Sequence, residues 1–450
     1  IHHFFVPPML SPERQEALSI TTPKAYLLSL SPPRSPPFDS AQRALLMGND
    51  PSKFPLIKVQ PSVWQHHPNS VNQESNPYLV DPWIRYILQR SYQQQTKWNK
   101  TMRHPHLLNN RDGLTLWLDR NFSVSTLNKL RDGGWFRSIC DTLVLLGLPA
   151  LAISSPRSTL TYMKLSRQGQ CIPYGQHRLQ IIELLNSQTN SQNVLLFVHG
   201  GAWGSGSPWM YRLVARGFPN HIVAIVGYRT YPDADIRGQV SDLTDALKVL
   251  KSHIPKGSSI ALMGHSSGAQ IAQMHILMMA LTWIQSGKSL TSYRCPYTAY
   301  VGLSGPYDIA SHFHFEAARG LEELSPLKAA GGLTEINLKR NSPVYLLEQI
   351  LLRSNPMDDI SQYFPPRILL LHGIEDTTVP FTATADWKRR LQSVGIPAQS
   401  CYLPRTGHQD TVLQLMLGES CSQRSLKYVQ LWLNSKNTDV HGLVGIQSRL

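Results

Sequence analysis

The chain of 450 residues is long enough for one large domain with extensions, or for roughly two to three domains. With 42% hydrophobic residues it is not a wholly disordered protein, and five cysteines without a CxxC pair exclude a disulfide-rich scaffold and argue against a zinc ribbon. The net charge of +14 favours anionic surfaces such as a membrane, but the basic residues are dispersed, so we expect no nucleic-acid partner.

The first 133 residues are basic and rich in proline, glutamine and serine. Fourteen of the chain's 32 prolines lie within the first 82 residues. Proline blocks helix interiors and removes donors from sheet ladders. We therefore expect residues 1–133 to form a largely disordered N-terminal extension.

The segment 134–160 is apolar. Its uncharged part, Thr142 to Ile153, reads TLVLLGLPALAI, which is 12 residues with an internal proline. A spanning helix needs ~20 apolar residues, so this segment is too short to cross a bilayer. Basic residues just upstream, such as Arg131 and Arg137, are typical of a membrane-surface anchor. A helix packed on the neighbouring domain would have a similar composition, and the sequence leaves both interpretations open.

From about Cys171, short apolar runs alternate with longer amphipathic stretches. The expected strands are Leu179–Leu185, Asn193–Val198, Ile222–Val226, Ser259–Met263, Ala299–Leu303, Arg367–Leu371 and Ser400–Leu403, and helices are expected over Gly238–His253 and Ala269–Ile284. Apolar strands separated by helices predict an open, mostly parallel sheet buried on both faces. The fold class is therefore α/β, in a domain over 161–437 followed by a tail at 438–450. Ligands of such sheets bind beyond the carboxyl ends of the strands.

The strand Ser259–Met263 is followed by Gly264-His265-Ser266-Ser267-Gly268 and then by a helix. G-x-S-x-G between a strand and a helix predicts a sharp turn that exposes its central serine as a nucleophile. The flanking strand and helix make a glycine-lined turn with an incidental serine the weaker interpretation. Ser266 is therefore the expected nucleophile.

The strand Asn193–Val198 is followed by His199-Gly200-Gly201-Ala202-Trp203. Acyl transfer needs backbone N–H groups directed at the developing oxyanion, and glycines let the backbone come close. We expect the N–H groups of Gly200, Gly201 and Ser267 to form an oxyanion hole. His199 is expected to fix the loop rather than to act in catalysis, and Trp203 either lines a substrate pocket or packs within the loop.

Asp376 and His408 follow the last two expected strands. A triad needs a carboxylate to orient its imidazole, and Glu375 and Asp308 are the competing carboxylates, although Asp308 is also a typical helix cap. The order Ser266, Asp376, His408 matches that of the α/β-hydrolases. These three residues are therefore the expected catalytic set.

The segment 306–362 is too long for a simple connection between a strand and a helix, and we interpret it as a helical cap over the site. Its aromatic residues indicate an apolar substrate. His312 and His314 invite a metal-site interpretation, but we identify no carboxylate or cysteine partner near them, so we expect no metal. We also expect no cofactor.

Together these motifs resemble the isoprenylcysteine alpha-carbonyl methylesterases, a branch of the α/β-hydrolases. The segments that carry the resemblance are Tyr174 to Leu184, His199–Trp203, Gly227-Tyr228-Arg229, Gly264–Gln270, Gly305–Asp308 with Phe313–Gly320 and Leu324–Pro326, and Thr406–Asp410. The match covers roughly Cys171 to Trp432. His265 and Ser267 depart from the glutamine and alanine expected around the nucleophile in that family.

The resemblance implies a serine carboxylesterase that hydrolyses prenylcysteine methyl esters. The residues expected to line its substrate pocket are Trp203, Tyr228, His265, Tyr307 and Phe313. Family members carry apolar membrane segments before the hydrolase domain, so a membrane surface is an expected partner. An intracellular location, associated with the endoplasmic reticulum or Golgi, fits this and the sparse cysteines.

Three alternatives stay open at this point. Kynurenine formamidases and bacterial feruloyl-esterase-like proteins share the glycine loop and the elbow, so the chain could be an amidase. A general carboxylesterase or lipase would use the same triad. A hydrolase fold can also serve as a catalytically inactive binding module.

Overall fold

The computed structural model describes residues 132, 134–189, 191–318, 325–355, 357–417 and 423–435. Apart from Asp132, the disordered extension expected over 1–133 lies outside the described residues. The tail expected at 438–450 lies entirely outside them. The range 319–324 also lies outside the described residues, and it includes parts of two segments that carry the family resemblance.

Eight strands form one sheet in the order β1-β2-β4-β3-β5-β6-β7-β8. The strands are β1 (Gln170–Pro173), β2 (Ile181–Leu185), β3 (Asn193–Val198), β4 (Ile222–Val226), β5 (Ser259–His265), β6 (Ala299–Leu303), β7 (Ile368–Gly373) and β8 (Gln399–Leu403). β2 pairs antiparallel with both of its neighbours, and all pairs from β4 to β8 are parallel. With a G-x-S-x-G turn after β5, this is an α/β-hydrolase sheet, so the predicted fold class is confirmed.

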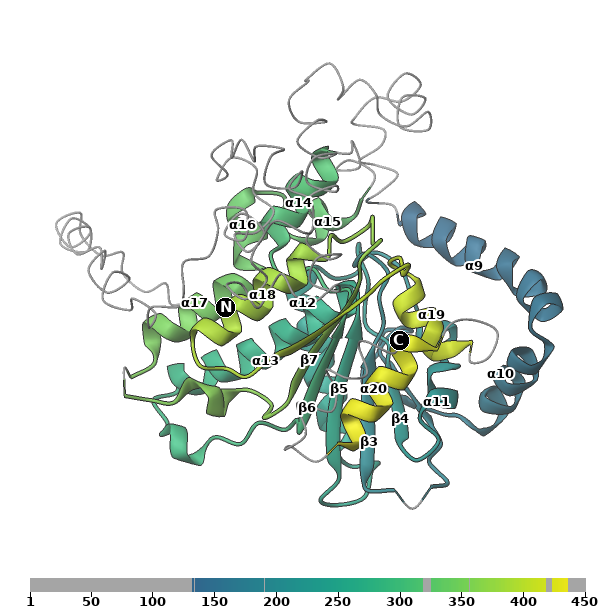
Figure 1. Ribbon diagram of the computed structural model, residues 1–450, viewed down its shortest axis with the longest axis horizontal. Coiled ribbons are helices and arrows are strands. Elements are labelled where there is room, and N and C mark those ends of the chain that lie inside the picture. The colour runs from purple at the N-terminus through teal and green to yellow at the C-terminus, as the bar shows by residue number, and fades with distance from the viewer. Residues whose placement is uncertain are drawn as a thin grey trace, which may run out of the picture. The chain divides into compact units, whose positions relative to one another are not determined.

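Helices cover both faces of the sheet, which explains why the central strands are apolar without alternation. On β3, Leu196 packs into one core and Leu195 and Phe197 pack into the other. The first core is closed by α12 (Ile236–Leu250), α13 (Ser267–Gln285), α17 (Pro343–Arg353) and α18 (Thr382–Ser393). The second is closed by α10 (Pro156–Gln168), α11 (Val214–Gly217), α19 (Asp410–Met416) and α20 (Arg424–Asn434). Figure 1 shows these two groups on opposite sides of the strands.

The sequence predicts the central strands closely. β3, β4 and β6 have the expected bounds, and β5 and β7 continue two residues further, to His265 and Gly373. The sequence does not predict β1, a four-residue edge strand whose side chains are mostly exposed. It has no apolar run and becomes a strand by pairing with β2.

The apolar segment forms α9 (Trp135–Ser154), a helix of 20 residues that is followed directly by α10. α10 crosses the boundary expected at 160. On α9, Ile139, Leu143 and Leu145 are exposed by 45%, 63% and 54%. Over the described ranges, the structure contains no helix that combines the length and the apolar character needed to span a bilayer.

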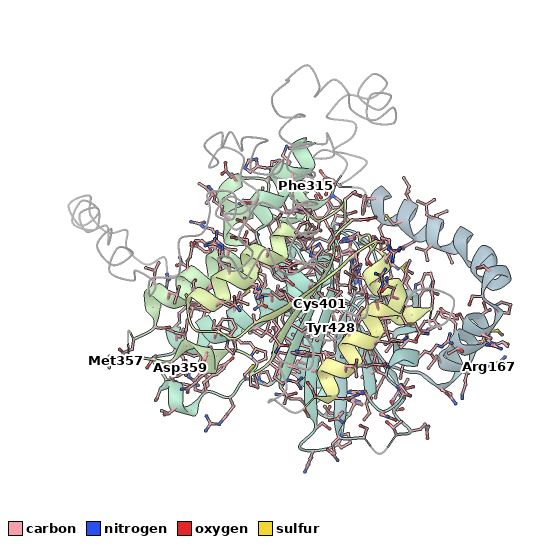
Figure 2. The ribbon with its side chains drawn as sticks, in the orientation of Figure 1. Arg167, Phe315, Met357, Asp359, Cys401 and Tyr428 are labelled. Carbon is pink, nitrogen blue, oxygen red and sulfur yellow. The ribbon has the colours of Figure 1, made fainter. Side chains whose placement is uncertain are left out.

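The insertion between β6 and β7 is helical, as expected for a cap. It contains α14 (Ile309–Ala318), α15 (Leu327–Ala330), α16 (Glu335–Arg340) and α17, followed by a 3-10 helix at Ile360–Tyr363. α14, α15 and α16 lie together beyond one end of the sheet, whereas α17 runs beside α13 (Figure 1). Figure 2 shows Phe315 at the position of α14, beyond this end of the sheet. α17 buries Leu346, Leu347 and Ile350, so the insertion forms part of the core as well as a cap.

Candidate active site

Ser266 lies in a strained turn between β5 and α13. Its backbone angles are φ 55° and ψ −127°, a region that a residue with a side chain rarely adopts. A Cβ added to Gly264 would lie 2.5 Å from the Gly268 carbonyl oxygen, and one added to Gly268 would overlap the His199 carbonyl oxygen. Both glycines are therefore needed, because they bring the start of α13 against β5 and the end of β3.

Ser266, His408 and Asp376 form one hydrogen-bonded chain. His408 Nε2 lies 2.8 Å from Ser266 Oγ, and His408 Nδ1 lies 2.7 Å from Asp376 Oδ2. A carboxylate only accepts, so Nδ1 carries the hydrogen and Nε2 of the neutral imidazole accepts from the serine hydroxyl. The structure thus brings together the three residues expected as the catalytic set, in the tautomer that a general base requires.

Asp376 is the carboxylate at one end of these hydrogen bonds, and its side chain is fully inaccessible to solvent. Burial alone would raise its pKa, but hydrogen bonds from His372 and His408 outweigh burial and hold the pKa of Asp376 well below its usual range. Its Oδ1 also accepts from the backbone N–H groups of Thr378 and Val379, each at 2.8 Å. Asp376 is therefore a carboxylate at neutral pH.

The glycine loop after β3 has its carbonyl groups fixed by hydrogen bonds. The Tyr228 hydroxyl donates to the His199 carbonyl at 2.8 Å, and His199 Nδ1 donates to the Gly200 carbonyl at 2.9 Å. The Ser205 hydroxyl donates to the Gly201 carbonyl at 3.0 Å. In a planar trans peptide, the N–H of the next residue points opposite to the carbonyl. These bonds therefore also orient successive N–H groups of the loop, beginning at Gly200.

Two of the three predicted oxyanion donors, Gly200 and Ser267, lie beside Ser266. A Cβ added to Gly200 would be 3.1 Å from Ser266 Cβ, so this part of the loop packs against the elbow. Ser267 is the first residue of α13, and the N–H of a first helical residue has no acceptor within its helix. Ala202 follows the glycines with φ 50°, and its N–H is oriented by the Gly201 carbonyl. It is a further donor candidate that the sequence interpretation did not include.

His199 is fully buried between two tyrosine rings. Its ring stacks on Tyr228 with centroids 4.3 Å apart and on Tyr211 at 5.7 Å. Burial lowers the pKa of His199 to about 4, so the imidazole is neutral at physiological pH. Its contacts are with the loop, in agreement with a structural role.

The residues predicted to line the substrate pocket lie in several places. Trp203 is buried, and its Nε1 donates to Gln270 Oε1 at 3.0 Å. Tyr307 is also buried, with its ring stacked on Trp387 at 5.6 Å. Phe313 is half-buried on α14. Their contact with a substrate stays a prediction.

The other two predicted pocket residues contact the glycine loop and His408. Tyr228 fixes the glycine loop through its hydroxyl, as described above. His265 Nε2 donates to the His408 backbone carbonyl at 3.2 Å, and the two rings are 5.1 Å apart. Burial lowers the pKa of His265 to about 3. A neutral ring therefore lies beside His408.

Two carboxylates of the insertion between β6 and β7, Asp308 and Glu316, also have defined partners. Asp308 accepts from the backbone N–H of Ser311 at 3.1 Å, which is the cap that its position before α14 suggested. Glu316, which the sequence interpretation overlooked, lies one turn after His312 with its Oε1 3.4 Å from His312 Nε2. In the described part of the chain, no group of three His, Cys, Asp or Glu side chains is arranged to hold a metal ion.

Comparison with known proteins agrees with this fold. A family model described as BD-FAE matches residues 181–391. A "Probable isoprenylcysteine alpha-carbonyl methylesterase" of Arabidopsis thaliana is 30% identical over 255 residues, which cover 54% of this chain and 51% of that protein. A kynurenine formamidase of Drosophila melanogaster is 24% identical over 267 residues, which cover 57% of this chain and 80% of that protein.

A solved structure also aligns with the chain. The crystal structure of esterase B from Lactobacillus rhamnosis aligns with a TM-score of 0.47 and 16% identity, covering 69% of this chain and 97% of that one. The chain spans about half the length of the Arabidopsis methylesterase that it matches. The described domain has the α/β-hydrolase sheet, and over about half of the chain its sequence is similar to proteins named isoprenylcysteine alpha-carbonyl methylesterases.

Proposed function

We propose that the chain is a serine carboxylic ester hydrolase with Ser266, His408 and Asp376 as its catalytic triad. The observation that carries this proposal is the continuous hydrogen-bonded chain from Asp376 through His408 to a serine in a strained elbow. The sequence similarity to proteins named as methylesterases supports the same reaction class.

In this mechanism His408 Nε2 takes the proton from Ser266 Oγ as the oxygen attacks the ester carbonyl carbon. The carbonyl π electrons move to its oxygen, which accepts hydrogen bonds from the N–H groups of Gly200, Gly201 and Ser267. His408 then protonates the departing alcohol, leaving an acyl-serine. Water, deprotonated by the same nitrogen, releases the acid and restores the hydroxyl of Ser266.

The electrostatics around the triad favour this cycle. Asp376 stays ionised and stabilises the imidazolium that forms when His408 takes the proton. His265 adds no opposing positive charge, because its pKa is lowered to about 3 by burial. The N-terminal end of α13 favours the negative charge that develops at Ser266.

We further propose the methyl ester of a prenylated C-terminal cysteine as the substrate. Apart from the sequence similarity, support comes from the position of α9. A Cβ on Gly204 would be 3.1 Å from Phe136 Cδ1, and the Cys140 thiol hydrogen-bonds to the Ser205 side chain. The helix with exposed apolar side chains therefore packs on the loop that continues from the proposed oxyanion hole.

The same region suits a membrane surface, where prenylated substrates reside. α10 exposes Leu160 and Met163 together with Arg157, Lys164 and Arg167. Arg167 lies at the outer side of this helix (Figure 2). Apolar side chains mixed with cations are typical of helices that lie in the headgroup region of anionic membranes. We propose that α9 and α10 contact an endomembrane surface.

The experiment that tests the proposed function is labelling with a fluorophosphonate probe, comparing the wild-type chain with Ser266→Ala. Labelling that is lost in the variant and blocked by a farnesylcysteine methyl ester supports both the nucleophile and the substrate class. Labelling that the ester does not block supports the serine hydrolase and removes the prenylcysteine proposal. No labelling of the folded wild-type chain would favour a binding module.

The amidase alternative needs its own comparison, because a kynurenine formamidase is among the similar proteins. Wild-type chain is given N-formylkynurenine and farnesylcysteine methyl ester in parallel, and the kcat/KM values are compared. A higher value for N-formylkynurenine, absent in Ser266→Ala, would replace the ester proposal with an amidase.

A further inference from the structure

Asp376 contacts a second histidine that the proposed reaction does not use. His372 is on β7, and its side chain is fully inaccessible to solvent. Its Nε2 lies 3.1 Å from Asp376 Oδ2, the same oxygen that accepts from His408 Nδ1 at 2.7 Å. One carboxylate oxygen therefore lies between two imidazole rings.

The tautomer of His372 follows from its other partners. Nε2 also lies 2.9 Å from the Val379 carbonyl oxygen, which only accepts, so Nε2 carries a hydrogen. Nδ1 lies 2.8 Å from Thr384 Oγ1. In the neutral ring Nδ1 accepts, so the Thr384 hydroxyl donates to it. Both nitrogens of His372 are thus used, and the orientation of the ring is fixed from β7 and α18.

Both carboxylate oxygens of Asp376 accept hydrogen bonds. Its Oδ1 accepts from two backbone N–H groups. Its Oδ2 accepts from His408 Nδ1 and shares the single hydrogen on His372 Nε2 with the Val379 carbonyl. A carboxylate offers about four lone-pair sites, so this buried anion is fully satisfied. Removing one donor would leave a buried charge short of a partner, which is the costly case for a hydrogen bond to an ionised group.

We propose that His372 is a positioning residue of the triad, which fixes Asp376 Oδ2 opposite His408 and stabilises its negative charge, with Thr384 fixing the tautomer of His372. This inference rests on the proposed function, because it concerns the carboxylate of the proposed triad. His372 does not reach Ser266 through any contact described above, so its effect is transmitted through Asp376.

Other titratable groups lie around this pair and must be separated from it. His265 of β5 lies beside His408, and Tyr402 of β8 is paired in register with His372. Burial lowers the pKa of His265 to about 3 and raises that of Tyr402 to about 12, so neither titrates between pH 5 and 9. Glu375 is the other carboxyl group of this loop.

The test compares two replacements of His372 in the full chain. His372→Leu removes the donor at similar size, and His372→Gln keeps an amide donor near the position of Nε2. The control is His275→Leu, because His275 is also fully buried and also contacts a threonine, with its Nδ1 3.1 Å from Thr244 Oγ1. The readouts are kcat and KM for a short ester across pH, and fluorophosphonate titration of active sites.

We expect His372→Leu to lower kcat by about tenfold or more, since a hydrogen bond to a charged group is lost, while KM changes by less than about threefold. With one donor fewer, Asp376 binds a proton more readily. The His408–Asp376 pair then keeps its proton to higher pH. The acid limb of the profile of kcat/KM against pH therefore shifts to higher pH. His372→Gln should recover most of the activity and bring the acid limb back to its wild-type pH. His275→Leu should change neither kcat nor the pH of the acid limb.

The outcomes separate the inference from the function that it rests on. If Ser266→Ala abolishes turnover but folded His372→Leu shows normal kcat and an unmoved acid limb, the inference is overturned and the hydrolase stands. A loss of kcat without a shift of the limb, and without recovery in His372→Gln, means a purely structural role and also overturns it. Turnover retained by Ser266→Ala overturns the proposed function itself.

A second variant keeps the test decisive if His372→Leu does not fold. Thr384→Val removes the hydroxyl donated to His372 Nδ1 with little change of shape, although Thr384 is fully buried. We expect an upward shift of the acid limb in this variant too, smaller than that in His372→Leu. An acid limb identical to that of the wild type in Thr384→Val overturns the inference.

Discussion

Tyr228→Phe tests whether the glycine loop is oriented by the residues beneath it. The substitution removes one hydroxyl, which donates to the buried His199 carbonyl at 2.8 Å, and leaves the ring stacked on His199. A buried carbonyl left without its donor costs about 1 to 3 kcal/mol of stability. The peptide that carries the Gly200 N–H also loses the bond that orients it. Loss of a whole oxyanion donor lowers kcat by about 10² to 10³, so a misoriented donor should lower kcat by roughly tenfold.

The assay measures the midpoint of thermal unfolding, and kcat and KM for a short ester and a farnesylcysteine ester. We expect kcat to fall by a similar factor for both esters with KM almost unchanged, because the loop acts on the reacting carbonyl. Tyr211→Phe is the matched control, since its hydroxyl lies 3.4 Å from the Gly200 carbonyl and contributes little. If Tyr228→Phe instead raised KM for the farnesyl ester alone, with normal stability, Tyr228 would line the substrate pocket and the loop argument would be refuted.

Three further changes have outcomes that follow from the structure. Gly268→Ala should abolish soluble, active protein, because its Cβ would overlap the Val198 and His199 carbonyl oxygens. Gly257→Ala has no atom within 4 Å of its Cβ and adds only the backbone strain of φ 81°, so it should fold with slightly lower stability. Expression and unfolding curves check both. Burial lowers the pKa of His275 to about 3 from 6.5, so its contribution to stability is present above pH 6.5 and is lost as pH falls toward 3. The unfolding free energy of His275→Leu should therefore fall less between pH 7 and 5 than that of the wild type, by about 2 kcal/mol. Leu143→Glu on α9, which places a charge on a side chain 63% exposed, should reduce binding to anionic vesicles and leave turnover of a short soluble ester unchanged; equal vesicle binding would remove the membrane proposal.

The central strands and the three residues expected to form the triad could be predicted because their signals are local. β3, β4 and β6 are uninterrupted apolar runs between helices, and such runs become buried parallel strands wherever the sheet places them. Ser266, Asp376 and His408 each follow a strand, and parallel strands end at one edge of the sheet. Their order along the chain therefore predicts that they meet.

Residues whose role depends on a partner far away in sequence could not be predicted in this way. Tyr228 stays a predicted pocket residue, and its contact with the loop that follows β3 was not predicted. Its place depends on β3 and β4 being neighbours in the sheet, which no pattern in either strand indicates. Glu316 was overlooked beside His312 although the two are four residues apart, a spacing that brings side chains together in the helical cap expected for this segment.

The sequence leaves open whether Asp376 or Glu375 contacts His408, and the local backbone geometry after β7 explains why it is Asp376. Both carboxylates follow β7, and the sequence alone favours neither through charge. Asp376 Oδ1 accepts from the N–H groups two and three residues later, a local turn that the short aspartate side chain forms well. This turn directs its other oxygen toward His408 and His372 together. A glutamate at the same position has an additional methylene, so the same two backbone bonds would displace its second oxygen from the imidazoles. The loop therefore selects an aspartate through its backbone donors. His372 near the end of β7 fits this interpretation, because it contacts the oxygen to which the turn donates no hydrogen bond.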